Sequence, residues 1–496
     1  MALQLNPPPE FMETIPIDHF LALPRPDVNV GTPAGAPDTS TLAAHDFDVD
    51  TRSGFMPPDP PLTRLPEQWE SWEAALEDAI ASKLQLGDKV DLSEDDRERA
   101  RRWQARVRNM PILPTTDLKR SELLLRRAHH VLAWIMHFFI RTLPPDTPDI
   151  RIPPPITVPL LQVSAHLQLP PVLTYSDDVL YNWALKNSVP LTYEAPIPAL
   201  DNLRCLTLFT GTRDEEEFYL TSARIELKGV RALSLMRATM DEAFVGDEIA
   251  IQRITSYLHH LAEVIGEMTK LLMSVREGCD PNVFYNDIRP WFRGADSDIA
   301  NGKSWIFEGL ELDPDLKYPT ELSGPSAGQS SIIHALDIFL GVDRYSHASH
   351  ITGQSSSSKS SSSSKSSSDS ASSAAEQKPS ISFLTRMQSY MPRHHRAFLR
   401  HLSANPRPLR TLVESSDNAA IKEAYNTAVS ALKVFRDAHV RIVALYIVGP
   451  SRRGQRPETE SQGTGGTSAI RFVKSVRDQT AGAVIPTSPA TSDSSA

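Results

Sequence analysis

One histidine, His439, lies where an imidazole could bind a metal. Around it, apolar residues recur at steps of three or four, which predicts a single helix with one buried face. That face carries Ile421, Ala424, Ala428, Leu432, Phe435, His439, Ile442 and Tyr446. A buried imidazole needs a partner, which is either a hydrogen-bonding group of the core or a metal such as haem iron. The helical pattern alone favours the core histidine.

A second residue suited to chemistry is Arg289, because a guanidinium can hold a carboxylate through two parallel hydrogen bonds. It stands within residues 284–294, which read FYNDIRPWFRG. The residue types by themselves favour an exposed arginine paired with Asp287 or Glu267.

Other patterns indicate less. The glycine-rich residues 463–467, GTGGT, resemble a phosphate-binding loop only superficially, because no strand precedes them and no Lys-Ser/Thr pair follows. The adjacent histidines at 129–130, 259–260 and 394–395 lack the spacing of a zinc site, and we expect most of them to be solvated.

The composition excludes several classes of protein. A net charge of −10 over 496 residues argues against a nucleic-acid partner. Two cysteines, Cys205 and Cys279, provide no disulfide framework and suit a reducing compartment. The longest apolar run, 131–140, is too short to span a membrane, and residues 1–11 do not resemble a signal peptide. We therefore expect a cytoplasmic protein with no membrane partner.

Helical periodicity dominates the chain, so the predicted fold class is all-α, with a minor strand pair at 203–210 near the linker between two domains. Helices are predicted at 67–84, 94–108, 121–141 and 248–276, with Ser121 as a cap, and a further helix opens near Phe218. The expected organisation is a proline-rich extension at 1–46, a small helical domain at 47–195, a linker at 196–216, a large helical domain at 217–482 with a disordered serine-rich insertion at 352–380, and a disordered tail at 483–496.

Several segments resemble, in the same order, motifs of the indoleamine 2,3-dioxygenase family. They are LPPVLTYSDDVLYNW at 169–183, FYLTS at 218–222, FYNDIRPWFRG at 284–294, SGPSAGQSS at 323–331, MPRHHRAFL at 391–399, KEAYN at 422–426, FRDAH at 435–439 and GTGGT at 463–467. The serine-rich insertion and the long N-terminal extension are similar to those of fungal members.

The resemblance implies an enzyme that binds haem b, with His439 as the proximal ligand of the iron. It places an Arg436–Asp337 pair behind that histidine as the second shell of the haem. The substrate-binding residues that it implies are Tyr175, Phe218, Ser222, Phe284, Arg289, Ser326, Ala327 and Thr464. No side chain is expected to act as an acid or base.

The activity that the resemblance implies is the insertion of O₂ into the indole ring of L-tryptophan to form N-formylkynurenine, the first step of the kynurenine route to NAD. It also implies an electron donor that keeps the iron ferrous, and a monomer. The alternative is a haem-binding sensor or scaffold of the same fold with weak or no turnover.

Three residues depart from the family's pattern. Asp178 replaces a small uncharged or apolar residue near the pocket, where a carboxylate is costly unless it faces solvent. Pro325 replaces a glycine of the haem-edge loop, and Arg293 replaces a small residue close to Arg289. These departures bear on substrate affinity and turnover rather than on haem binding.

Overall fold

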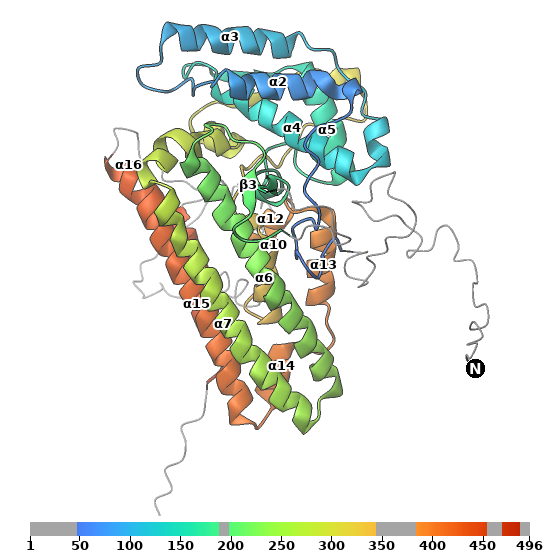
Figure 1. The fold of residues 1–496 in the computed structure, drawn as a ribbon, viewed down its shortest axis with the longest axis vertical. Coiled ribbons are helices and arrows are strands. Elements are labelled where there is room, and N and C mark those ends of the chain that lie inside the picture. The colour runs from blue at the N-terminus through green and yellow to red at the C-terminus, as the bar shows by residue number, and fades with distance from the viewer. Residues whose placement is uncertain (1–46, 188–197, 344–382, 454–468, 487–496) are drawn as a thin grey trace, which may run out of the picture.

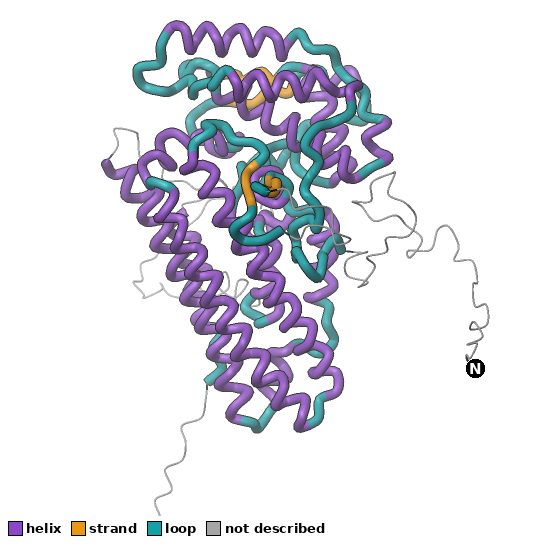
Figure 2. The backbone as a smooth tube through the Cα atoms, in the orientation of Figure 1, coloured by secondary structure: helices purple, strands orange, loops and turns teal. Residues whose placement is uncertain are grey.

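The computed structural model describes residues 47–187, 198–343, 383–453 and 469–486. Helices dominate it, and they form two groups: shorter helices at one end of the molecule and a long bundle at the other (Figures 1 and 2). The all-α prediction is confirmed. The predicted N-terminal extension at 1–46, the serine-rich insertion at 352–380 and Thr464 lie outside the described residues.

The first group consists of α2 (Glu70–Ala81), α3 (Glu94–Arg108), α4 (Glu122–Arg141) and α5 (Pro154–Leu167). The prediction for α3 matches its bounds. Ser121 caps α4, since its hydroxyl accepts a hydrogen bond from the Leu124 N–H at 3.5 Å. The helix predicted at 67–84 is shorter than expected: it begins as a 3₁₀ turn, Glu67–Trp69, and ends at Ala81, just before Lys83 takes a left-handed backbone conformation with φ of 49°.

The long bundle is built on α6 (Arg213–Val245), α7 (Glu248–Gly278) and α15 (Ala419–Val443), and both α6 and α15 pack along α7 (Figure 1). Most of the apolar residues of α7, among them Ile254, Leu258 and Ile265, are buried, so α7 is a core helix. The remaining helices are α8 (Pro281–Val283), α9 (Ala295–Ala300), α10 (Ser331–Phe339), α12 (Phe383–Gln388), α13 (Arg393–Ser403), α14 (Leu409–Ser415), α16 (Gly449–Arg453) and α17 (Ala469–Gly482).

Two small sheets join distant segments. Strand β1 (Asp149–Ile152) runs parallel to β4 (Ser304–Phe307), and β2 (Trp183–Leu185) runs antiparallel to β3 (Leu203–Cys205). The strand predicted within 203–210 therefore exists, but the expectation that both strands lie there is wrong. The Asn182 side chain explains where the pairing stops, because its amide accepts from the Thr207 N–H at 2.8 Å and donates to the Thr207 carbonyl at 3.0 Å.

Residues 483–486, which the sequence assigned to the disordered tail, pack against the bundle. Ala483 and Ile485 are buried against the bundle, and the Asn426 side chain exchanges two hydrogen bonds of 2.9 Å with the main chain of Ile485. The burial of Ala483 and Ile485, together with the hydrogen bonds from Asn426, holds these residues in place.

The predicted start of the large domain, residue 217, falls inside a helix, because α6 begins at Arg213. Tyr219 and Leu220 of α6 belong to the core of the shorter helices.

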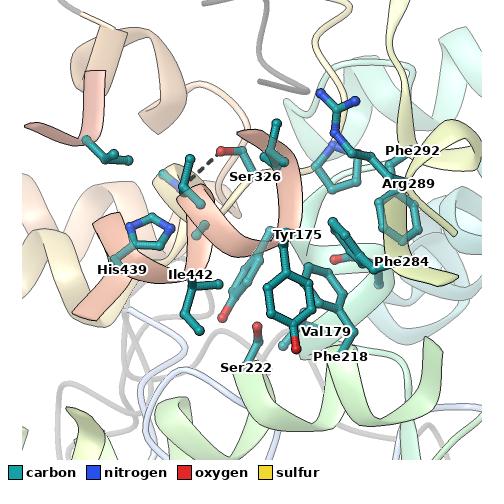
Figure 3. A pocket seen from close by; sticks show the side chains of 18 of the residues that line it. Tyr175, Val179, Phe218, Ser222, Phe284, Arg289, Phe292, Ser326, His439 and Ile442 are labelled. Atoms are coloured by element: carbon teal, nitrogen blue, oxygen red, sulfur yellow. Dashed lines mark hydrogen bonds between the residues drawn. The ribbon is translucent and has the colours of Figure 1, made fainter. Parts of the chain in front are cut away.

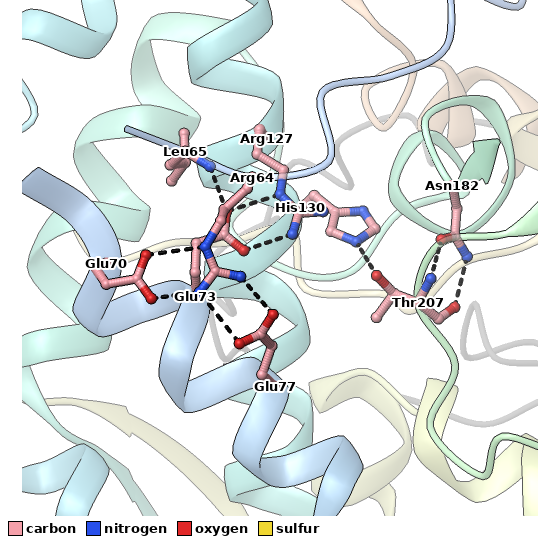
Figure 4. A network of polar contacts seen from close by, with 9 residues as sticks. All are labelled: Arg64, Leu65, Glu70, Glu73, Glu77, Arg127, His130, Asn182 and Thr207. Atoms are coloured by element: carbon pink, nitrogen blue, oxygen red, sulfur yellow. Dashed lines mark hydrogen bonds and ion pairs between the residues drawn. The ribbon is translucent and has the colours of Figure 1, made fainter. Parts of the chain in front are cut away.

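A polar network holds the shorter helices together (Figure 4). Glu73 of α2 accepts two hydrogen bonds from Arg127 of α4, at 2.6 and 2.9 Å, and one from the Leu65 N–H at 2.8 Å. Nearby, His130 contacts the Thr207 hydroxyl at 2.8 Å. This contact ties α4 to the segment that leads into α6.

Several histidines that the sequence suggested were solvated are buried. His129, His130, His137 and His395 are all at most 1% exposed, whereas His259 and His260 are exposed. Partners distant in sequence account for the difference: His129 contacts Asp177 at 2.8 Å and the Pro170 carbonyl at 3.1 Å. No helix within the described ranges is long and apolar enough to cross a membrane.

Candidate active site

A cavity of about 180 Å³ lies where the two groups of helices meet. Its walls come from the turn at 175–179, α6, the segment 284–292 and the loop 325–328. The C-terminal end of α15, the π-helical turn that follows it at 444–448, α12 and α17 complete them. Figure 3 shows side chains from these elements converging on one space. The lining residues that the sequence predicted are Tyr175, Phe218, Ser222, Phe284, Arg289, Ser326, Ala327 and His439.

His439 projects from α15 into this cavity (Figure 3). A second recess of about 110 Å³, bordered by α10 and α15, also reaches His439. Within the described part of the chain, neither nitrogen of its imidazole has a hydrogen-bond partner. Burial, aided by the charge of Arg436, lowers the pKa of His439 to about 4. The ring is therefore neutral at pH 7, with a nitrogen lone pair available to a metal.

Behind His439, Arg436 forms a buried ion pair with Asp337 of α10. One guanidinium nitrogen lies 2.5 Å from both carboxylate oxygens, and the guanidinium also donates to the hydroxyl of Thr480 on α17. The pair that the sequence predicted is present. Because it connects three helices, it holds the part of α15 that carries His439 in place.

Aromatic rings form much of the cavity wall. Phe218 lies 4.4 Å from Phe284, measured between ring centroids, and 6.0 Å from Phe292 in a stacked arrangement. Phe284 contacts Tyr446 at 5.6 Å. The helical spacing of Phe218 and Ser222 puts both on one face of α6, so the Ser222 hydroxyl lies among these rings (Figure 3). Such a wall suits a flat aromatic ligand with few hydrogen-bonding groups.

Arg289 is 4% exposed, so the interpretation of it as a surface arginine is wrong. Its guanidinium carbon lies 5.5 Å from the centre of the Tyr285 ring, and Glu267, one of the carboxylates considered as its partner, pairs instead with Lys228. The residue begins a 3₁₀ turn, Arg289–Phe292, directly after a π-helical turn, Phe284–Ile288. These two turns direct Phe284 and Arg289 into the same cavity.

The loop at 323–330 crosses close to this segment because two glycines lack side chains. A Cβ at Gly324 would lie 1.9 Å from the Phe292 carbonyl oxygen, and one at Gly294 would lie 2.1 Å from the Leu322 oxygen. Gln329 fixes the loop, since its side chain donates to the Gly324 carbonyl at 3.0 Å and accepts from the Tyr175 N–H at 2.8 Å. Pro325, Ser326 and Ala327 are thereby presented to the cavity.

Glu226 lies beneath the cavity on α6 and was not predicted. One of its oxygens accepts from the hydroxyls of Tyr175 at 3.0 Å and Ser330 at 2.6 Å, while the other, Oε2, has no partner among the described residues. Burial raises the pKa of Glu226 to about 7. The sequence held a signal for it, because Glu226 follows Ser222 by four residues and therefore shares the buried face.

Asp178 also lines the cavity, and it does not face solvent, being 4% exposed. Burial, followed by the charges of Asp177 and Glu215, raises its pKa well above the ordinary value. Burial therefore favours the neutral acid over the carboxylate, whose burial is costly. Arg293 points elsewhere: it lines a separate recess and lies 3.9 Å from Asp88.

These features fit a haem. Apolar and aromatic side chains border both recesses around His439, and its imidazole has the neutral form that binds iron. In the described residues, no cluster of three or more histidines, cysteines or carboxylates could hold a bare metal ion. The fold and cavity thus define a helical protein suited to a histidine-ligated haem.

Comparison with known proteins identifies the family. A model described as "Indoleamine 2,3-dioxygenase" matches residues 43–483. The chain is 32% identical to an indoleamine 2,3-dioxygenase, acdA, of Aspergillus candidus over 453 residues, covering 90% of this chain and 99% of that one. It is 31% identical to the indoleamine 2,3-dioxygenase of Saccharomyces cerevisiae, covering 87% and 91%. It is also 29% identical to a 6-hydroxytryptophan 2,3-dioxygenase, fscD, of Fusarium equiseti, covering 87% and 95%.

The chain belongs to the indoleamine 2,3-dioxygenase family. It is therefore a dioxygenase of a haem-dependent family, and its substrates are O₂ and a tryptophan-like molecule.

Proposed function

We propose that this chain inserts both atoms of O₂ across the 2,3 double bond of an indole amino acid, with L-tryptophan as the parent substrate and N-formylkynurenine as its product. The observation that carries the proposal is that Arg289 and His439 line the same aromatic cavity. One is suited to a carboxylate and the other to haem iron, and the rings between them suit an indole.

In this proposal His439 holds the iron of haem b, and the Arg436–Asp337 pair keeps its helix in position. Ferrous haem, when bound, supplies the activation of O₂ that the reaction requires, and an external donor keeps it reduced. The reaction would make this chain a source of kynurenine-type products on the route toward NAD.

The side chains contribute binding and orientation. Arg289 holds the substrate carboxylate, and Phe218 and Phe284 pack against the flat indole ring. Ser222 offers the polar contact for the indole N–H. Tyr175, Ser326 and Ala327 complete the wall, and Thr464 is proposed to close over the substrate. Burial raises the pKa of Asp178 well above its ordinary value, which disfavours the ionised form that a general base needs. Exclusion of water by the aromatic wall keeps the reaction confined to the bound substrate.

The test is turnover by purified, haem-loaded and reduced protein supplied with L-tryptophan and O₂. Mass spectrometry should detect a product that has gained two oxygen atoms, and both should come from labelled O₂. If the protein binds haem but converts no indole amino acid, the proposal fails and a sensor or scaffold of the same fold is favoured.

A further inference from the structure

His129 of α4 contacts both ends of the segment 170–177, which leads into the cavity wall. Its Nδ1 atom lies 2.8 Å from Oδ1 of Asp177, and its Nε2 atom lies 3.1 Å from the carbonyl oxygen of Pro170. A carbonyl and an ionised carboxylate only accept hydrogen bonds, so each ring nitrogen needs a proton to donate. The imidazolium, the charged form of histidine, satisfies both contacts at once.

Two other buried histidines of α4 have different surroundings. His137 lies 2.7 Å from a main-chain carbonyl, which accepts, and 3.3 Å from a main-chain N–H, which donates. One ring proton satisfies both of these contacts. His130 contacts the Thr207 hydroxyl at 2.8 Å, and its Nδ1 has no partner among the described residues. A neutral ring suits each of these two sites, whereas His129 faces two acceptors.

The charges around His129 favour its protonation. Burial opposes a charged ring, but the carboxylate of Asp177 and the two hydrogen bonds outweigh it, so the pKa of His129 is raised above 6.5. Arg126 on the same helix opposes the charge, although Arg126 is itself paired with Asp48 at 2.8 Å. Burial also acts against the charge of Asp177, but the nearby His129 and His130 outweigh it and lower its pKa below 3.8. Both members of the His129–Asp177 pair are therefore charged between pH 3.8 and pH 6.5.

Asp177 transmits this contact to the cavity wall. Its Oδ2 atom accepts from the Thr174 N–H at 2.9 Å and from the Thr174 hydroxyl at 2.7 Å, and its own N–H donates to the Thr174 carbonyl at 2.9 Å. These bonds close the turn from which Tyr175, Asp178 and Val179 line the cavity (Figure 3). Asp177 is not among the described residues that line it, so the His129–Asp177 pair acts from behind the wall.

Loss of the ring proton would break this arrangement. A neutral ring turns a nitrogen lone pair toward either the carboxylate or the carbonyl oxygen, and a buried carboxylate loses its charged partner. One of the two contacts then opens, and the segment 170–177 is released from α4 at that point. His439 lies on α15, a different element, so the expected change affects the substrate wall and leaves haem binding intact.

We propose that His129, acting through Asp177, is a positioning residue for the substrate: its protonated ring holds Tyr175 and Val179 in place, and substrate affinity falls when the ring loses its proton. This inference rests on the proposed function, since the ligand whose affinity changes is the indole amino acid. A single proton outside the cavity would thereby control substrate binding.

The experiment measures KM and kcat for L-tryptophan, and its Kd from the change in the haem spectrum, from about pH 6 to about pH 9.5. In the wild type Kd and KM should rise about tenfold, the effect of losing one charge-assisted hydrogen bond, while kcat changes little. His129→Gln should remove the rise. Asp177→Asn should move it to lower pH, because the carboxylate no longer stabilises the ring proton. A role confined to stability would produce no such shift.

His130→Gln is the matched control, because it alters the next residue of α4, a buried histidine whose pKa is lowered to about 3. Its pH profile should follow the wild type, and it thereby accounts for titration of the substrate and of the haem. Nitrogen NMR of protein with ¹⁵N-labelled histidine rings, in its diamagnetic carbon monoxide complex, gives a second readout. At pH 6 one signal set should show two protonated ring nitrogens, and His129→Gln should lack it.

Thermal unfolding shows which variants fold, and both the wild-type profile and the NMR spectrum need no variant. Parallel pH profiles for the wild type and His129→Gln would overturn the inference while leaving the proposed function intact. A neutral His129 ring at pH 6 would also overturn it. Failure to bind or convert an indole amino acid at any pH would instead refute the proposed function, whatever the charge of His129.

Discussion

Two buried histidines of the shorter helices, His129 and His137, differ from the polar groups around the cavity. Both ring nitrogens of His129 have partners, and His137 contacts the Trp291 carbonyl at 2.7 Å and the Leu173 N–H at 3.3 Å. Around the cavity the imidazole of His439, Oδ1 of Asp178 and Oε2 of Glu226 lack partners within the described chain. The first arrangement stabilises a fold, whereas the second leaves groups for ligands to satisfy.

The largest expected effect concerns His439. Replacing it with alanine should abolish stable haem binding, because the proposed protein ligand of the iron is removed. The haem-to-protein ratio and the visible spectrum of the purified variant measure this. In His439→Gly, added imidazole should restore binding by occupying the vacated space.

His137 provides the control for this comparison, because its imidazole is buried and, like that of His439, has its pKa lowered to about 4. His137→Asn should lower the thermal midpoint while folded protein still binds haem. If His439→Ala bound haem as the wild type does, His439 would have no greater role in haem binding than His137.

Glu226 should make stability depend on pH. Its pKa rises from 4.5 to about 7 on folding, so the folded state binds the proton more tightly than the unfolded state. This contribution is fully present below about pH 4.5 and is lost as the pH rises through 7. The loss amounts to about 3 kcal/mol, from the shift at about 1.4 kcal/mol per unit.

Glu226→Gln removes this titration while keeping a polar side chain of similar size. Chemical denaturation of both proteins at pH 5 and pH 8 measures the difference. Relative to the wild type, the variant should gain stability on going from pH 5 to pH 8. A constant difference across this range would show that Glu226 has the same pKa in both states.

Arg289→Ala should lower kcat/KM for tryptophan by about ten- to a hundredfold, since hydrogen bonds to charged groups are worth about 1.5–3 kcal/mol. The haem spectrum should stay unchanged. Tryptamine, which has no carboxylate, is the control substrate: any turnover of it by the wild type should be much less sensitive to the substitution. Equal losses for both substrates would assign Arg289 a role in the fold instead.

The sequence predicted local features best. Helix α3 was located because its buried residues Ala100, Trp103 and Val107 recur at steps of three and four. The same periodicity put His439 on the inner face of its helix, and the resemblance assigned it to the cavity. Partners distant in sequence could not be derived. The pairing of β3 with β2, and the burial of His130 against Thr207, depend on contacts between segments that are apart in the sequence and that folding brings together.

The candidate site was predicted in the same uneven way. The resemblance supplied the residues facing the cavity, but neither periodicity nor resemblance revealed that Glu226 and Asp178 are buried acids with raised pKa values. Those properties arise from the neighbours that surround each carboxyl group. A sequence predicts burial of a helix face more readily than the protonation state of a group on it.

The smallest effect is expected at the surface of the shorter helices. Arg64 contacts Glu70 and Glu77, but its side chain is 40% exposed and those of its partners are 45% and 63% exposed. Solvent screens such pairs, so Arg64→Ala should cost about 0.2–1 kcal/mol in the free energy of unfolding.

In the same network (Figure 4), Arg127 and Glu73 are 9% and 1% exposed, and Arg127→Ala leaves a buried carboxylate without its main partner. That variant should lose about 3–5 kcal/mol. Chemical denaturation of both variants at low and high salt checks the contrast, because salt should weaken only the contribution of Arg64. Equal losses for the two arginines would mean that burial does not separate structural pairs from surface pairs in this region.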